Sequence, residues 1–325
     1  MTTEQNAVSS ALQRVKAAPQ ALYLVAAILI ICVVLSFLSE AFLTPANLLN
    51  VLRQASTVFL LAAGLTFVLI AGGFDLSIGA NLGLSAGVAG TVMVATGSPL
   101  IGAAAGLAVS GLVGLGNGLL VTLLRLPPFI ATYGTLWIVH GLTYYYMAGG
   151  TVGGFKPEFR FIGTGYVFGV PFPIIIMLLV CIAGSWFATR TTYGRDIFAI
   201  GSNSTAAKFS GIKVNSRQIL VYVLSGLAAG IASLVFLARI NSVEGDIGEG
   251  LLLPAVAAAV IGGVSLFGGV GSLWGTLAGA IILTLIINGM NLLSINANWQ
   301  PLVTGAVILV AILLDFSSRR SKEGV

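Results

Sequence analysis

Residues 21–38 read ALYLVAAILIICVVLSFL, an apolar run without a single charged side chain. An α-helix needs about 20 such residues to cross the hydrocarbon core of a bilayer. The run is long for the core of a signal peptide, and no small-x-small cleavage pattern follows it. It therefore predicts an uncleaved first membrane span, preceded by a polar segment over residues 1–20.

The composition of the whole chain agrees with this stretch. Of the 325 residues, 57% are hydrophobic and only 8% are charged, and 42 are glycine. Soluble domains carry about 25% charged residues, so this chain could not cover the surface of a soluble fold of its size. The composition excludes a cytosolic enzyme, a disordered regulator and a secreted disulfide scaffold. It favours a polytopic membrane protein in which small residues let helices pack closely.

Successive apolar runs predict an all-α membrane protein with about ten spans in a single domain over residues 21–316. A tail over 317–325 follows, and the two long loops are 148–172 and 190–217. The Gly-Gly pairs at the second-to-third and eighth-to-ninth junctions mark either loops or breaks inside the membrane. The expected spans are 21–39, 55–72, 78–96, 100–123, 128–147, 173–189, 218–239, 251–267, 272–293 and 299–316.

The distribution of the 15 Lys and Arg residues over these spans predicts the orientation. Cytoplasmic loops of membrane proteins are enriched in Lys and Arg. With ten spans, eleven basic residues fall on the side of both termini and four on the other, so both termini and loop 190–217 are expected in the cytoplasm. The eleven are Arg14, Lys16, Arg125, Arg190, Arg195, Lys208, Lys213, Arg217, Arg319, Arg320 and Lys322; the four are Arg53, Lys156, Arg160 and Arg239.

The chain also contains a weak internal sequence repeat, which we call the echo. Asn117-Gly118 recurs as Asn288-Gly289, and at the same offset the ninth and tenth spans fall on the fourth and fifth. An offset of five helices would make the two halves inverted repeats, an arrangement found in many transporters. Chance is the competing explanation, because few identities support the echo.

The loop 190–217 carries the most specific local signal. Residues 201–204 read Gly-Ser-Asn-Ser, which are favoured N-cap residues, and Thr205–Phe209 can form a short helix. Gly211 suits the C-terminal end of that helix. The sequence thus predicts a small cytoplasmic helix beside Lys208, which either docks a partner protein or lies on the lipid surface.

Four motifs together resemble the membrane permease subunits of bacterial ATP-binding-cassette importers for ribose, xylose, arabinose and galactose. The resemblance runs from about residue 21 to 316, in the order of that family. Leu252-Leu253-Pro254 stands where the family often has Glu-Leu-Asp, and His140 stands where many members carry Arg, so the sugar is left open. The motifs are Gly72-Gly-Phe-Asp-Leu-Ser-Ile-Gly79, Pro127-Pro-Phe-Ile-Ala-Thr132, the loop pattern Tyr193-Gly-Arg195 to Ser210-Gly-Ile212, and Ile261-Gly-Gly-Val-Ser-Leu-Phe-Gly-Gly269.

The resemblance implies a transport subunit of the bacterial inner membrane that is not itself an enzyme. It implies a second permease copy or paralogue, a periplasmic sugar-binding protein and separate ATPase subunits. The chain has no Gly-Lys pair and hence no phosphate-binding loop of the usual type, so ATP and Mg would be held by the partner. No catalytic residue, cofactor or metal site is expected in this chain. The expected ATPase-coupling residues are Gly201, Asn203, Ala206, Ala207, Lys208 and Gly211.

Polar residues in or near the spans are the candidates for the translocation pathway. Asp75 follows a Gly-Gly break, and an ionisable group inside a membrane is costly and usually functional; a wetted loop carboxylate is the alternative. Asn side chains can pair with sugar hydroxyls or join helices to one another. His140 is either a hydrogen-bonded buried residue or a proton relay. The candidates are Asp75, Ser77, Asn81, Asn117, His140 and Asn288.

Charged residues in two outside segments are candidates for docking a binding protein through complementary charge. Ordinary solvated loop charge is the alternative. The tyrosines at 144–146 end the fifth span, where aromatic residues usually form an interfacial belt and could also stack on a sugar. The docking candidates are Lys156, Arg160, Glu244, Asp246 and Glu249.

Four other functions are compared with the importer permease. A branched-chain amino acid permease of the same superfamily would have the same architecture and a different binding protein. An ion-coupled secondary transporter would need a coupling carboxylate, for which only Asp75 is available. Aquaporin-type channels need paired Asn-Pro-Ala motifs, and intramembrane hydrolases need nucleophile or metal motifs; this sequence has neither.

Overall fold

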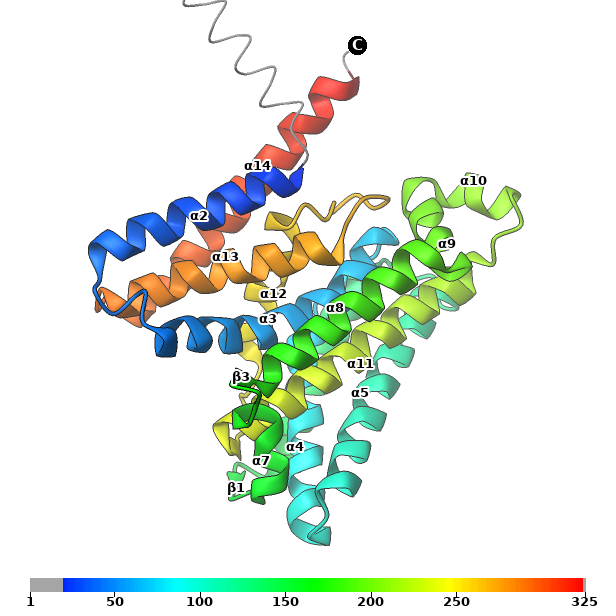
Figure 1. Cartoon of the computed structure of the whole chain (residues 1–325). Helices are drawn as coiled ribbons and strands as arrows, with labels where there is room; N and C mark the ends of the chain where they lie inside the picture. The colour runs from blue at the N-terminus through cyan, green and yellow to red at the C-terminus, as the bar shows by residue number, and fades with distance from the viewer. Residues whose placement is uncertain (1–19, 324–325) are drawn as a thin grey trace, which may run out of the picture.

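A computed structural model of the chain describes residues 20–323, and most of them are organised as α-helices (Figure 1). Arg14 and Lys16 of the predicted N-terminal segment 1–20 lie outside the described residues, as does the end of the predicted tail. The helices are α2 (Gln20–Leu38), α3 (Pro45–Ile70), α4 (Ile78–Thr96), α5 (Pro99–Thr122), α6 (Pro128–Met147), α7 (Pro157–Thr164), α8 (Phe172–Arg190), α9 (Thr192–Ser202), α10 (Ser204–Phe209), α11 (Val214–Ile240), α12 (Leu252–Ile261), α13 (Leu273–Leu292) and α14 (Gln300–Glu323). Short elements are β1 (Val152–Gly153), β2 (Tyr166–Val167), β3 (Val170–Pro171), β4 (Ser242–Val243) and the 3-10 turns η1 (Glu249–Leu251) and η2 (Ala297–Trp299).

Each expected span overlaps one of these helices, and three boundaries differ clearly. The tenth span was expected to end at residue 316, whereas α14 continues to Glu323 through most of the predicted tail. The helix of the second expected span, α3, begins at Pro45 and not near residue 55, because Thr44 caps it and proline suits a first helical position. The helix of the eighth expected span, α12, ends at Ile261 and not at residue 267, because Gly263 turns the chain with φ +81°. Within the described residues, seven helices are long and apolar enough to cross a membrane, namely α2, α3, α4, α5, α8, α11 and α13. The chain is a multi-pass membrane protein, and ten crossings stay a prediction.

The helix α3 forms the centre of the molecule. Its second half, from Phe59 to Ile70, is buried almost without interruption. Helices α8, α11, α12 and α13 pack around it (Figure 1). The pair α5 and α11 has the most extensive contact among the helices, and it depends on glycine: a Cβ on Gly114 would overlap the carbonyl oxygen of Tyr222.

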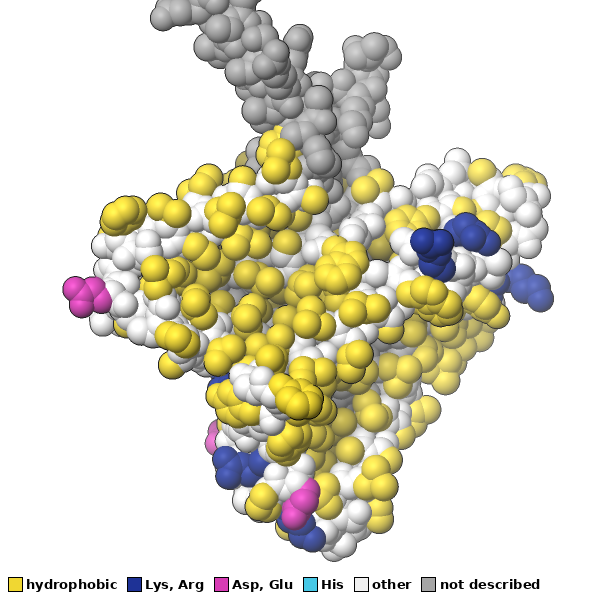
Figure 2. All heavy atoms as spheres, in the orientation of Figure 1, with side chains coloured by type: hydrophobic (Ala, Val, Ile, Leu, Met, Phe, Trp, Pro, Cys, Tyr) yellow, Lys and Arg dark blue, Asp and Glu magenta, His cyan; other side chains and the backbone are white. Residues whose placement is uncertain are grey.

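The surface has the distribution expected of a membrane protein. Figure 2 shows hydrophobic side chains over the middle of the visible face and charged side chains near its ends. Exposed apolar side chains line α2 and α8, among them Ile30, Phe37, Leu179 and Trp186. A soluble monomer rarely exposes so large an apolar surface, so lipid or another subunit must cover these helices.

The two long loops lie at opposite ends of the helices (Figure 1). Antiparallel pairing of β1 with β4 joins loop 148–172 to the segment after α11. The other loop contains two helices, α9 and α10, where one was expected. Gly201 and Ser202 belong to the end of α9, so only Asn203 of the predicted capping residues caps α10.

Candidate functional site

A break in the helical path between α3 and α4 carries the most polar part of the buried interior. The helix α3 stops because Gly72 adopts φ +76°, and the amides of Gly72 and Gly73 bond back to the carbonyls of Leu69 and Val68. Gly73 also leaves room for a neighbour, since a Cβ there would lie 2.8 Å from the Tyr222 hydroxyl. The Gly-Gly pair thus turns the chain into the segment that carries Asp75.

Asp75 is only 2% exposed, and its carboxylate is held by donors from three elements. Its Oδ1 accepts from the Ser77 amide at 3.0 Å and the Ser77 hydroxyl at 2.7 Å. Its Oδ2 accepts from the Ser225 hydroxyl of α11 at 2.7 Å. The Asn117 amide of α5 donates to Ser77 Oγ at 2.7 Å and to Asp75 Oδ1 at 3.4 Å. We call Asp75, Ser77, Asn117 and Ser225 the Asp75 cluster.

The backbone of the break is fastened as well. The Phe74 carbonyl accepts from the Thr132 hydroxyl of α6 and from the Tyr222 hydroxyl of α11, both at 3.3 Å. A buried carboxylate is tolerated only where hydrogen bonds replace its water. The arrangement therefore ties the break to α5, α6 and α11 at once, so a shift of any of these helices changes the bonding of Asp75.

The other predicted pathway residues fall in different places. Asn81 lies one turn into α4, where its amide donates to the Ser110 carbonyl at 3.1 Å and its Oδ1 has no hydrogen-bond partner. Asn288 forms a reciprocal amide pair with Asn47 of α3, at 3.1 and 2.8 Å. The structure thus brings Asp75, Ser77 and Asn117 together, puts Asn81 nearby, and uses Asn288 to join α13 to α3.

His140 lies apart from the Asp75 cluster, at a hollow between α4 and α6. The hollow has a volume of about 210 Å³. The His140 ring lies 5.8 Å from the Trp137 ring and 4.8 Å from the Tyr144 ring, measured between centroids. The hollow is lined by Leu76, Gly79, Ala80, Leu136, Trp137, His140, Gly248 and Leu252.

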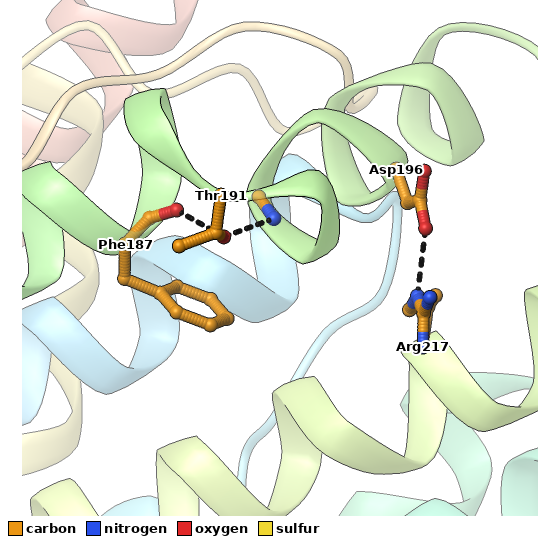
Figure 3. A network of polar contacts seen from close by, with 5 residues as sticks. Phe187, Thr191, Asp196 and Arg217 are labelled. Atoms are coloured by element: carbon orange, nitrogen blue, oxygen red, sulfur yellow. Dashed lines mark hydrogen bonds and ion pairs between the residues drawn. The ribbon is translucent and has the colours of Figure 1, made fainter.

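The helix α9 is anchored firmly to the membrane helices on either side (Figure 3). Thr191 caps it by accepting from the Gly194 amide at 3.0 Å, and its hydroxyl donates to the Phe187 carbonyl of α8 at 2.7 Å. On the other side, Arg217 of α11 binds Asp196 with 2.8 Å between Nε and Oδ2. The same guanidinium lies 4.0 Å from the centre of the Tyr193 ring. These contacts make α9 a rigid continuation of α8 and α11.

The short helix α10 projects from this platform. Asn203 caps it by accepting from the Ala206 amide at 2.9 Å, and Gly211 turns the chain away with φ +84°. Asn203, Ala206, Lys208 and Gly211 are exposed. Phe209, which sequence reasoning did not single out, is 87% exposed beside Lys208. Exposed aromatic rings are enriched at protein interfaces, so Phe209 marks α10 as a candidate contact surface.

Gly201 and Ala207, also predicted to couple to the ATPase, pack against their own chain. Ala207 is buried. A Cβ on Gly201 would overlap the Ile70 carbonyl, and a Cβ on Gly268 would lie 3.0 Å from the Cα atoms of both Gly201 and Gly72. Three backbones meet here without side chains, from the end of α9 and from the two glycine-rich breaks. Substituting Gly201 therefore tests this packing and not a free docking surface.

The predicted docking residues lie at the opposite end of the molecule. The β1–β4 pair brings the segments of Lys156 and Glu244 together. Lys156 donates to the Gly97 carbonyl at 2.6 Å and so ties its loop to the α4–α5 turn. Arg160, Glu244 and Asp246 are exposed, and Glu249 begins η1.

Sequence reasoning missed Ser225, Thr132 and Tyr222 as partners of the break. A signal for two of them was present, because Tyr222 and Ser225 are polar residues three apart in an apolar helix and so share one face. Thr132 was quoted only as part of a motif. Nothing in the sequence indicated which buried group these side chains would meet.

Comparison with known proteins shows which family this chain resembles. The family model for the branched-chain amino acid transport system permease component matches residues 47–312. The ribose import permease protein RbsC of Bacillus subtilis (strain 168) is 39% identical over 88% of this chain and 89% of its own length. The D-allose transport system permease protein AlsC of Escherichia coli (strain K12) is 36% identical over 88% of each chain. The galactose/methyl galactoside import permease protein MglC of the same strain is 34% identical over 89% of this chain and 91% of its own. No solved structure matches the chain.

Proposed function

The chain belongs to the branched-chain amino acid transport system permease family, and from this premise we propose that it is the membrane subunit of an ATP-binding-cassette importer for a monosaccharide. It is a transport component and not an enzyme. The observation that carries the proposal is similarity to three kinds of sugar permease over about nine-tenths of the chain. Their names favour a sugar over the branched-chain amino acids of the family's title.

The finer architecture is part of the proposal. Ten spans would place both termini in the cytoplasm, as the eleven-to-four distribution of Lys and Arg favours. The start of α2 and the end of α14 lie toward the same end as α10 (Figure 1), which fits an even number of spans. The echo of Asn117 in Asn288 fits two inverted halves. We place the protein in the bacterial inner membrane, paired with a second copy or a paralogue.

Energy would enter through α10. Its exposed face, with Lys208 and Phe209, would dock a partner ATPase that holds ATP and Mg, while Asn203 and Gly211 fix the helix ends. The platform that carries α10 is bonded to α8 and α11, and Gly201 contacts both glycine-rich breaks. A displacement of α10 would therefore reach the segment of Asp75 through backbone contacts, with no flexible side chain between them.

The substrate would arrive at the other end. A periplasmic binding protein would dock on the segments joined by β1 and β4, where Lys156, Arg160, Glu244 and Asp246 offer both charge signs. The bonding of Asp75 supports this scheme over an ion-coupled carrier. Both carboxylate oxygens already accept from hydroxyl or amide donors, so a transported cation would have to displace them.

The test is sugar uptake into proteoliposomes with the cognate ATPase and binding protein, each added or omitted. We expect uptake only when all three components and ATP are present, and a panel of pentoses, hexoses and branched-chain amino acids then identifies the substrate. Uptake by this chain alone along an ion gradient would refute the proposal. Uptake of leucine in place of any sugar would leave the architecture and overturn the substrate class.

A further inference from the structure

Five aromatic rings form a continuous row along α6. Centroids are 6.1 Å apart from Phe129 to Tyr133, 6.4 Å from Tyr133 to Trp137, 5.8 Å from Trp137 to His140 and 4.8 Å from His140 to Tyr144. These spacings are those of contacting rings. We call the five residues the aromatic ladder.

The ladder is too long to be an interfacial belt. From residue 129 to 144 it covers about 22 Å of helix at 1.5 Å per residue, against about 30 Å for the hydrocarbon core. Interfacial Trp and Tyr residues gather at the ends of a span. In the proposed ten-span arrangement α6 crosses the membrane, and Trp137 and His140 then lie in its middle, away from the lipid headgroups.

The ladder occupies its own strip on the helix. One side of α6, with Thr132, Val139 and Thr143, is buried against the protein. The opposite side presents aliphatic residues such as Ile130 and Ile138, which suit lipid. The ladder lies between these two sides and is largely exposed, with Trp137 at 58%. Because the Trp137 indole and the Tyr133 phenol are costly to place in hydrocarbon, a strip that carries them is better suited to surroundings more polar than lipid.

Two contacts connect the ladder to the break between α3 and α4. At its middle, Trp137 and His140 line the hollow of about 210 Å³ that also touches Leu76 and Gly79. At one end, the Phe129 ring lies 6.5 Å from the ring of Phe74, the residue before Asp75. The row of rings thus runs from the fastened break past a cavity at the start of α4.

We propose that the aromatic ladder is the track along which the sugar crosses the membrane, with Trp137 and His140 forming its central subsite. The inference rests on the proposed function. A sugar ring has C–H faces that pack on aromatic rings and hydroxyls that bond to polar tips, and the ladder supplies both. Successive rings at similar spacing bind the sugar repeatedly and weakly, which a transport pathway requires.

Access of water to the ladder distinguishes a sugar track from the two alternatives, which are cover by lipid and a dry contact with a second subunit. In the complete transporter reconstituted in vesicles, with Cys32 and Cys181 replaced by Ala, Trp137→Cys is compared with Ile138→Cys. A charged methanethiosulfonate reagent reacts with the thiolate, which forms in water and not in lipid. We expect position 137 to react about tenfold faster than position 138. Equal rates, or rapid disulfide formation between two copies through position 137, would overturn the track in favour of lipid or a dry seam between subunits.

Uptake measures the contribution of the ring. We expect Trp137→Ala to reduce the maximal uptake rate roughly three- to tenfold, the size of one aromatic contact. Trp137→Phe should restore most of the rate, and Ile138→Ala, the matched control on the adjacent side, should leave it unchanged. Co-purification of the ATPase with each variant verifies assembly. If the parent transports sugar and Trp137→Ala is as fast as Ile138→Ala, this inference fails alone; if the parent transports no sugar, the proposed function fails.

Discussion

Replacing Ser225 by alanine tests whether the Asp75 cluster holds the helix break in place. Ser225 is fully buried in α11, and its hydroxyl donates to Asp75 Oδ2 at 2.7 Å. No other hydrogen bond to that oxygen is formed among the described residues. Ser225→Ala removes one oxygen atom and leaves a buried acceptor without its partner.

The expected cost follows from that geometry. A hydrogen bond to a charged group contributes about 1.5–3 kcal/mol, and a buried acceptor left unsatisfied costs a similar amount. We therefore expect Ser225→Ala to lower the free energy of unfolding by about 2 kcal/mol. Asp75→Asn should cost less than Asp75→Ala, because an amide keeps one acceptor and can donate to the Ser225 hydroxyl.

The assay is unfolding of the purified permease in mixed micelles by increasing SDS, followed by circular dichroism. Ser36→Ala is the matched control, because among residues 20–323 the Ser36 hydroxyl bonds to the Val33 carbonyl of its own helix and to no other group, and its cost should stay within about 0.5 kcal/mol. A double-mutant cycle of Ser225→Ala with Asp75→Ala should show a coupling of about 1 kcal/mol or more. Additive costs would mean that the two side chains do not stabilise each other, and the reasoning would be wrong.

Three further predictions concern the contacts around this site. Gly201→Leu should destabilise the protein by about 1–3 kcal/mol, because the new Cβ would overlap a carbonyl oxygen of α3. In a detergent thermal-shift assay the control Gly116→Leu, whose Cβ would meet no atom within 4 Å, should melt at the temperature of the parent. Equal melting temperatures for the two variants would refute the close packing at Gly201. Arg217→Lys should lose the stacking on Tyr193 and the bond from Nε to Asp196, together worth about 1 kcal/mol, and should reduce ATPase-driven uptake with insertion unchanged; full uptake would show that this anchor does not matter. Asn288→Ala should cost about 1–2 kcal/mol through the lost amide pair with α3 and leave sugar selectivity unchanged; an altered sugar panel would return Asn288 to the pathway.

Much of the protein could be predicted from local sequence. The apolar runs and the Gly-Gly pairs each act within a few residues, and they indicated the membrane class, the helices and the breaks. The cap at Asn203 and the turn at Gly211 were equally local, because a cap bonds to an amide three residues away. The sugar-permease resemblance rested on the same short motifs.

Tertiary structure alone decided which of these features meet. Asp75 bonds to Ser225, which lies 150 residues further along the chain, and Asn47 bonds to Asn288, which lies 241 residues further along. Gly201, expected at a docking surface, instead packs on two breaks. In a membrane every helix is apolar, so hydropathy shows that a segment is inserted without showing which face meets which neighbour. That choice depends on close packing of small residues and on pairing buried polar groups, and both are properties of several helices together.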